Sequence, residues 1–131
     1  MDPIKLFTVI ALAAVPTVMF GGASLLRLLS AGKLTPAQKG TFRAGHAHAG
    51  VLLVLTLVVL DISAHGGLSV GARWVLCFLL LVGVLAQSGG FFINLATAGK
   101  PGWSAGNTVT LGGGILLAAA LIMAAVGAAT A

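Results

Sequence analysis

The sequence predicts an all-α membrane protein, with residues 1–131 forming a single domain in which four transmembrane helices make an up-down-up-down bundle. Hydrophobic residues make up 59% of the chain and charged residues only 7%, and the mean hydropathy is +1.14. Soluble domains carry about 25% charged residues, so most of this chain is expected to lie in lipid. Four charge-free stretches are long enough for spanning helices, which need about 20 apolar residues. Because these stretches are continuously apolar rather than alternating, a β-barrel is not expected.

The first expected span covers residues 6–29 and contains a proline near its middle, Pro16. Proline removes a backbone donor and kinks a helix, and membrane helices tolerate this where neighbouring groups satisfy the freed carbonyl. The apolar part is longer than the core of a signal peptide. We therefore interpret this segment as a retained span.

The second expected span covers residues 43–64 and opens with the stretch FRAGHAHAGVLLVL, residues 42–55. This stretch places His46 and His48 just inside the expected membrane edge. Two residues correspond to about 200° around a helix, so the two rings should point to different sides and are poorly placed to chelate one metal ion. We expect His48 to face the bundle and His46 to lie at the headgroup edge or at a protomer interface.

A short loop joins the second span to the third, residues 73–97, so these two spans should form an antiparallel hairpin. The hairpin brings Asp61 and Arg73 to a similar depth. A charge within a membrane costs about 2.5–3.5 kcal/mol on insertion scales. We therefore expect Asp61 and Arg73 to form an ion pair that closes the hairpin.

Polar residues interrupt the third span at Gln87, Ser88 and Asn94. Such residues usually face the interior of a helix bundle and form hydrogen bonds across helices. Because the spans are antiparallel, Asn94 should reach the depth of the histidines, with Gln87 deeper. We expect His48 either to form a hydrogen bond with Asn94 or to leave one ring nitrogen free for a ligand.

The fourth expected span, residues 104–128, consists largely of small residues. Gly106, Thr110, Gly114 and Ala118 recur every four residues, a spacing that lets two membrane helices approach closely. This face is predicted to serve packing, either within the bundle or across a dimer.

The distribution of positive charge predicts the orientation in the membrane. The net charge is +5, and five of the seven Lys and Arg residues bracket the first and third expected loops. Cytoplasmic loops carry the excess of Lys and Arg, so both termini should lie outside a bacterial inner (plasma) membrane. The lipid bilayer, rather than nucleic acid, is the expected partner. Cys77 is the only cysteine, which excludes a disulfide within the chain.

The polar residues of the spans define a candidate ligand-binding site in the cytoplasmic leaflet, made of His46, His48, Gln87, Ser88 and Asn94. Histidine titrates near neutral pH and its neutral ring binds metals, so the site would bind or transport a small ligand, an ion or a proton. The sequence contains no carboxylate pair for acid–base catalysis and no phosphate-binding glycine loop. We therefore do not expect a hydrolytic enzyme.

Two stretches, FRAGHAHAGVLLVL and AQSGGFF, carry a resemblance to small four-span integral membrane proteins of high-GC bacteria, which covers nearly the whole chain. Over five residues, the H-x-H-x-G pattern also resembles histidine motifs that open helices in haem–copper oxidase-type subunits. Those subunits use several further histidines within the membrane, so no catalytic residue is carried over.

Two alternatives to a ligand-binding or transport protein follow from these observations. One is a redox membrane protein that binds haem or a metal ion, with His46 and His48 as ligands. The other is a non-catalytic accessory subunit of a larger membrane complex. Four short helices bury little polar lining, so we expect a homo-oligomer or a subunit of such a complex.

Overall fold

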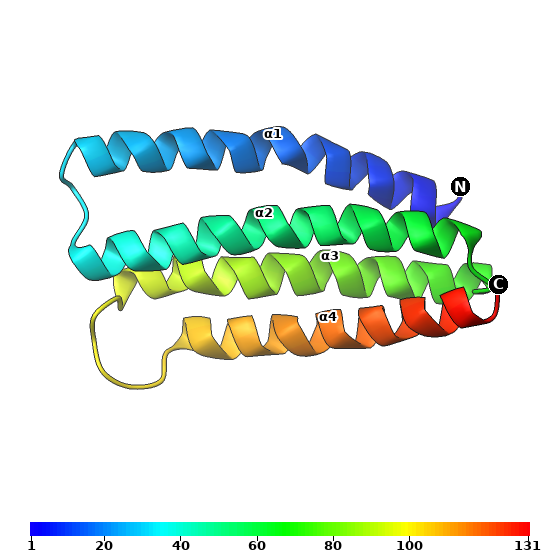
Figure 1. Ribbon diagram of the computed structural model, residues 1–131. Helices are drawn as coiled ribbons and strands as arrows, with labels where there is room; N and C mark the ends of the chain where they lie inside the picture. The colour runs from blue at the N-terminus through cyan, green and yellow to red at the C-terminus, as the bar shows by residue number, and fades with distance from the viewer.

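The computed structural model describes all of residues 1–131 and consists of helices joined by short links (Figure 1). Each of the four long helices is apolar enough to cross a membrane, which confirms the expectation of four long apolar helices. A one-turn 3-10 helix, η1, extends the third of them. The elements are α1 (Pro3–Ser30), α2 (Pro36–His65), α3 (Val70–Ile93), η1 (Asn94–Ala96) and α4 (Ala105–Ala129).

A polar side chain caps the N-terminus of each long helix. In α2, the Thr35 hydroxyl accepts a hydrogen bond from the Gln38 N–H, and the Gln38 side chain accepts one from the Thr35 N–H. This capping box satisfies two backbone donors, and proline at the first helical position, Pro36, has a backbone angle suited to a helix start. The helix therefore begins well before the predicted span at residue 43.

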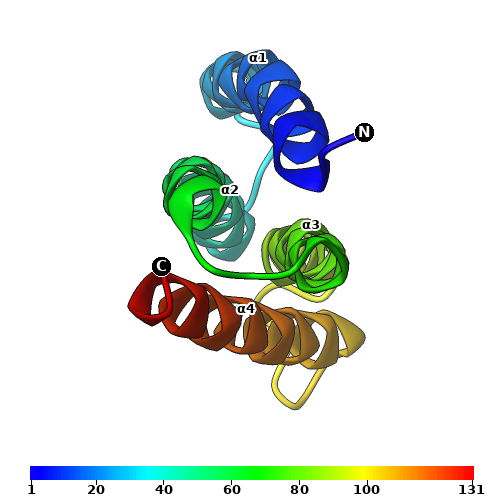
Figure 2. The ribbon, with the colours of Figure 1, turned by 90° about the vertical axis from the view of Figure 1, so that its right-hand side faces the viewer.

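The helices do not form a closed square. Both termini and the α2–α3 link lie at one end of the molecule, and the α1–α2 and α3–α4 links lie at the other (Figure 1). Seen along the helices, α2 and α3 lie between α1 and α4 (Figure 2). Accordingly, α1 contacts α2 and α3 but not α4, and the most extensive interface joins α3 to α4.

Glycines allow α3 and α4 to pack backbone against backbone. A Cβ atom on Gly113 would collide with the backbone N of Gln87 and would lie 2.8 Å from the carbonyl oxygen of Gly83. A Cβ atom on Gly90 would lie 2.8 Å from the backbone N of Thr110 and would collide with the carbonyl oxygen of Gly106. No side chain larger than hydrogen fits at these positions without a shift of one helix.

The small residues that α4 buries differ from the predicted set. The buried small residues are Gly106, Gly113, Ala120, Ala124 and Gly127, of which all but Ala124 are seven residues apart, whereas Ala118 is exposed. Helices that pack at a small crossing angle along their length repeat their contacts every seven residues. The expectation of a small-residue packing face was correct: Gly106 and Thr110 both contact Gly90 of α3, but the four-residue spacing does not extend to Ala118.

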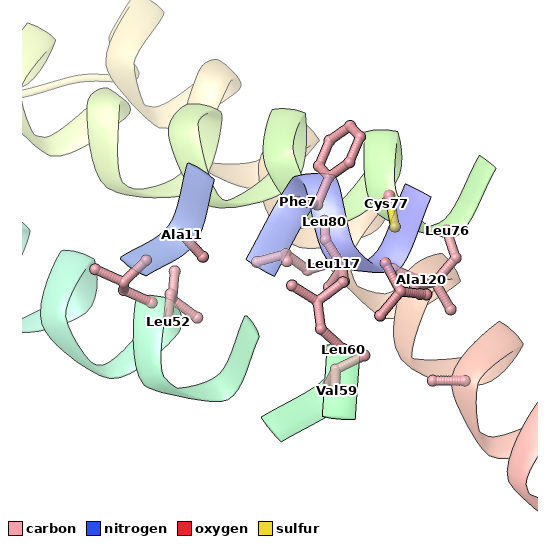
Figure 3. Close-up of a cluster of buried hydrophobic side chains, with 13 residues drawn as sticks. Phe7, Ala11, Leu52, Val59, Leu60, Leu76, Cys77, Leu80, Leu117 and Ala120 are labelled. Carbon is pink, nitrogen blue, oxygen red and sulfur yellow. The ribbon is translucent and has the colours of Figure 1, made fainter. Parts of the chain in front are cut away.

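Buried apolar side chains from all four helices form one core (Figure 3). Leu60, Leu76 and Leu80 are at most 1% exposed. The contribution of α1 comes mainly from its N-terminal half, where the ring of Phe7 lies edge-on to Trp74 and Phe78, with centroid distances of 6.1 and 5.3 Å.

The first prediction compares two adjacent glycines of α4. In Gly113→Ala, the new methyl group meets backbone atoms of α3 that cannot rotate away, so we expect a loss of about 1–3 kcal/mol in the free energy of unfolding, as for other overpacked sites. A Cβ atom on Gly112 would meet no atom within 4 Å, and Gly112→Ala should leave stability unchanged or slightly raised, because alanine favours helix. Thermal unfolding in detergent, followed by circular dichroism, measures both. Equal melting temperatures for the two variants would contradict the packing described here.

Candidate functional site

The link between α3 and α4 turns sharply because two glycines adopt left-handed backbone angles. Gly99 has a φ of +83° and Gly102 a φ of +107°, values that side-chain-bearing residues rarely adopt. The chain then returns to Ser104, whose hydroxyl accepts a hydrogen bond from the Asn107 N–H at 3.1 Å and caps α4. The link thus places the first turn of α4 beside the end of α3.

Asn94 joins these two elements. Its Nδ2 donates a hydrogen bond to Oδ1 of Asn107 at 2.8 Å, and its Oδ1 accepts one from the hydroxyl of Ser104. A Cβ atom on Gly106 would collide with Oδ1 of Asn94. The amide–hydroxyl cluster of Asn94, Ser104 and Asn107 therefore depends on the glycine contact between α3 and α4.

The first turns of α2 form another wall of this region. The Gln38 Nε2 donates a hydrogen bond to the Leu95 carbonyl at 3.4 Å. A Cβ atom on Gly99 would lie 3.2 Å from the Cβ of Ala37, so the α3–α4 link lies against α2. Further along, the absence of a side chain at Gly45 lets α2 approach Phe91 of α3.

These elements line an open pocket of about 580 Å³, here called the end pocket. Its volume falls within the range of about 300–1,000 Å³ that is typical of small-molecule sites. A second cavity, of about 80 Å³ between α1, α2 and α3, is lined almost wholly by apolar side chains. The end pocket is lined by Gly40, Thr41, Ala44, Phe91, Asn94, Thr97, Ala98, Gly99, Lys100, Pro101, Gly102, Trp103, Ser104, Ala105 and Asn107.

Positive charge gathers at the end of the molecule that holds the end pocket. The last turn of α1, the first loop, the first turns of α2 and the α3–α4 link carry five of the seven Lys and Arg residues: Arg27, Lys33, Lys39, Arg43 and Lys100. The only two acidic side chains, Asp2 and Asp61, lie towards the other end, near the N-terminus of α1 and the C-terminus of α2. No carboxylate side chain neutralises the charge around the pocket.

His46 packs against α1, a contact that the sequence did not predict. Its half-buried ring faces α1, where a Cβ atom on Gly22 would lie 3.0 Å from the imidazole Nε2 and one on Gly21 would lie 3.6 Å from Nδ1. Two consecutive glycines make room for the ring between α1 and α2. The expected position of His46 at the headgroup edge or at a protomer interface stays a prediction.

His48 is exposed, so the prediction that it faces the bundle interior was wrong. Its Nδ1 lies 3.1 Å from the carbonyl oxygen of Ala44, and its ring lies beside Phe91 with a centroid distance of 4.7 Å. No hydrogen bond joins His48 to Asn94, whose amide bonds Asn107 and Ser104 instead.

The two histidines are directed to different neighbours, His46 to α1 and His48 to Phe91 of α3. Nowhere does the structure bring three His, Cys, Asp or Glu side chains together as a metal-binding group. A shared metal ion held by His46 and His48 does not fit this arrangement. The predicted divergence of the two rings around the helix agrees with it.

Gln87 and Ser88 lie in the packed part of α3 and do not line the end pocket. The backbone carbonyl of Gln87 accepts a hydrogen bond from the Thr110 hydroxyl at 3.4 Å. The hydroxyl of Ser88 is buried and has no hydrogen-bond partner. Of the five predicted ligand-binding residues, Asn94 alone is part of the pocket wall.

The expected ion pair between Asp61 and Arg73 does not form. The Arg73 guanidinium instead donates hydrogen bonds to the carbonyl oxygens of Leu68, at 3.1 Å, and Gly66, at 3.0 Å, while Asp61 is exposed. The carbonyls of the short α2–α3 link lie within reach of the arginine and lack helical partners. Arginine therefore closes the hairpin by capping its loop.

Most of the pocket wall was not predicted from the sequence, because its residues lie in a segment that has the composition of a turn. The stretch from Thr97 to Asn107 combines glycine and proline with polar side chains and one tryptophan. This stretch follows Asn94 and links two antiparallel spans, so its polar side chains should return close to Asn94. That closeness was the signal that would have identified Ser104 and Asn107. The chain matches no protein-family model, no curated protein and no solved structure.

The second prediction separates Asn94 from His48. Asn94→Ala removes two hydrogen bonds and leaves Ser104 and Asn107 without that partner, which should cost about 1–3 kcal/mol of stability. His48→Ala removes an exposed ring and should change stability by at most about 0.5 kcal/mol. Melting curves in detergent compare the variants. A larger loss for His48→Ala than for Asn94→Ala would show that the cluster does not hold this end together.

Proposed function

We propose that this chain is a multi-pass protein of a bacterial plasma membrane, with four helices arranged up-down-up-down, and that it binds a small polar ligand in the end pocket. The observation that carries the binding role is the pocket itself, in which an amide–hydroxyl cluster lines a cavity of ligand size. Ligand sites commonly combine a concave surface with a few convergent polar groups.

The outer faces of the helices support insertion into a membrane. Large apolar side chains point outward on each helix, for example Val9, Val54, Leu85 and Ile122, each more than 60% exposed. Such continuous apolar surface is rare on soluble monomers and matches lipid. The helices also bond their own backbone groups, as the hydrocarbon region requires.

The orientation follows from the charge. Cytoplasmic loops are enriched in Lys and Arg, so the end with Arg27, Lys33, Lys39, Arg43 and Lys100 faces the cytoplasm and both termini face outward. The end pocket then opens at the cytoplasmic surface.

Binding is better supported than transport through one chain. Beyond the end pocket, the half of the bundle next to the α2–α3 link is filled by Leu60, Leu76 and Leu80, which are at most 1% exposed. These side chains leave no polar path along the bundle axis. His46 and His48 lie outside the pocket lining, so a proton or haem role at these histidines has less support than ligand binding beside Asn94.

The third prediction tests the orientation with single cysteines in a Cys77→Ser background. Lys33→Cys, in the first loop, should react with a membrane-impermeant thiol reagent only after intact cells are permeabilised. Ala131→Cys, at the C-terminus, should react without permeabilisation. Labelling of Lys33→Cys in intact cells would reverse the orientation, and equal labelling of both positions in every condition would contradict insertion.

The fourth prediction tests whether the end pocket holds a ligand. Thr41 lines the pocket, and Thr41→Trp would fill part of it with an indole ring. Native mass spectrometry of protein purified in mild detergent should show a bound small molecule on the wild-type chain and on the control Lys33→Trp, but not on Thr41→Trp. Absence of an adduct from the wild type, or its persistence in Thr41→Trp, would contradict the proposed function.

A further inference from the structure

We propose that the ligand of the end pocket is an anion that carries a phosphate group, either as a phospholipid headgroup or as a soluble phosphate ester. This inference rests on the proposed function, because it assigns a chemical class to the ligand of that pocket. It follows from the charge of the wall, from the groups that remain free there and from the size of the cavity.

The wall of the pocket carries an uncompensated positive charge. Lys100 lines the cavity, and its ammonium group has no hydrogen-bond or ion-pair partner in the protein. The lining contains no Asp or Glu, and the two acidic side chains of the chain, Asp2 and Asp61, lie towards the far end. An anionic ligand would supply the missing negative charge.

Among the amide side chains of the wall, the group that has no hydrogen bond is a donor. Oδ1 of Asn107 already accepts from Asn94, and Oδ1 of Asn94 accepts from Ser104. The Nδ2 of Asn107 has no partner and joins the Lys100 ammonium as a free donor. Phosphate oxygens are acceptors, and hydrogen bonds between a cation and an anion are about twice as strong as neutral ones.

The size and place of the pocket favour an ester over the bare ion. A phosphate ion would leave most of the 580 Å³ unfilled. In the proposed orientation the pocket lies at the level of cytoplasmic headgroups, and Trp103 in its wall is of the residue type enriched at membrane–water interfaces. Anionic headgroups of that leaflet attract clustered Lys and Arg. A headgroup and a soluble phosphate ester would present the same group to Lys100.

The experiment uses Trp103 as a reporter. Trp74 and Trp103 are the only tryptophans, so the full chain with Trp74→Phe, in non-ionic detergent, emits from the pocket wall alone. Four probes are titrated: short-chain phosphatidylglycerol, glucosyl diacylglycerol as an uncharged headgroup, glycerol 3-phosphate, and glycerol. Lys100→Gln is compared with Lys33→Gln, which removes the same charge from the same end of the molecule but outside the pocket.

We expect phosphatidylglycerol, glycerol 3-phosphate or both to shift the Trp103 emission saturably, and the uncharged probes to have no effect. A response to phosphatidylglycerol alone assigns a lipid, and a response to glycerol 3-phosphate alone assigns a soluble ester. Lys100→Gln should raise the Kd about fivefold, the effect of one surface cation on anionic lipid binding. Lys33→Gln should change the Kd by less than about twofold, because exposed charges further away are screened by salt.

Three outcomes would overturn the inference. If glucosyl diacylglycerol shifts the emission as strongly as phosphatidylglycerol, the pocket binds headgroups without selecting charge, and the proposed function stands while its ligand class falls. If Lys33→Gln weakens binding as much as Lys100→Gln, the attraction is diffuse surface charge. If no probe shifts the emission, the phosphate assignment is wrong, and the mass-spectrometric comparison of Thr41→Trp decides the proposed function separately.

Discussion

The close approach of α3 and α4 is the constraint on which the rest of this structure depends. Gly83 and Gly90 on α3 meet Gly106 and Gly113 on α4 at distances that admit no side chain. Apolar burial contributes little to helix association in lipid, where contact between backbones and hydrogen bonds across helices take over. The seven-residue repeat of the small residues keeps the two helices in contact along their length.

This contact also determines where polar groups meet. Because Gly106 has no side chain, the amide of Asn94 can reach both Asn107 and the Ser104 cap, and the α3–α4 link folds back over the first turns of α2. The end pocket is thus a consequence of helix packing. At the opposite end, the N–H of Gly67 donates to the Gly127 carbonyl at 2.8 Å, so a second backbone contact fastens the other end of α4.

Composition and hydropathy were enough to predict four long apolar helices, because each run exceeds the length that a span requires. They also identified Asn94, since an amide in an apolar run needs a partner. They did not identify that partner, because Ser104 lies in a link whose path depends on backbone angles at glycine. The rotation of α2, which decides what His46 and His48 meet, depends on helix contacts that periodicity alone does not specify. Arg73 was likewise expected to pair with the side chain of Asp61, whereas it donates hydrogen bonds to carbonyl oxygens of the α2–α3 link.

A solid-state NMR measurement tests the α3–α4 contact most directly. The chain would carry ¹³C at the carbonyl carbon of Gly90 and at the α-carbon of Gly106 and would be reconstituted in lipid bilayers. The structure predicts a direct dipolar cross-peak between these two carbons, because the Gly90 carbonyl lies against the α-carbon of Gly106. If contacts within each helix are observed and this cross-peak is absent, the two helices do not approach through their glycines and the origin proposed for the end pocket is wrong.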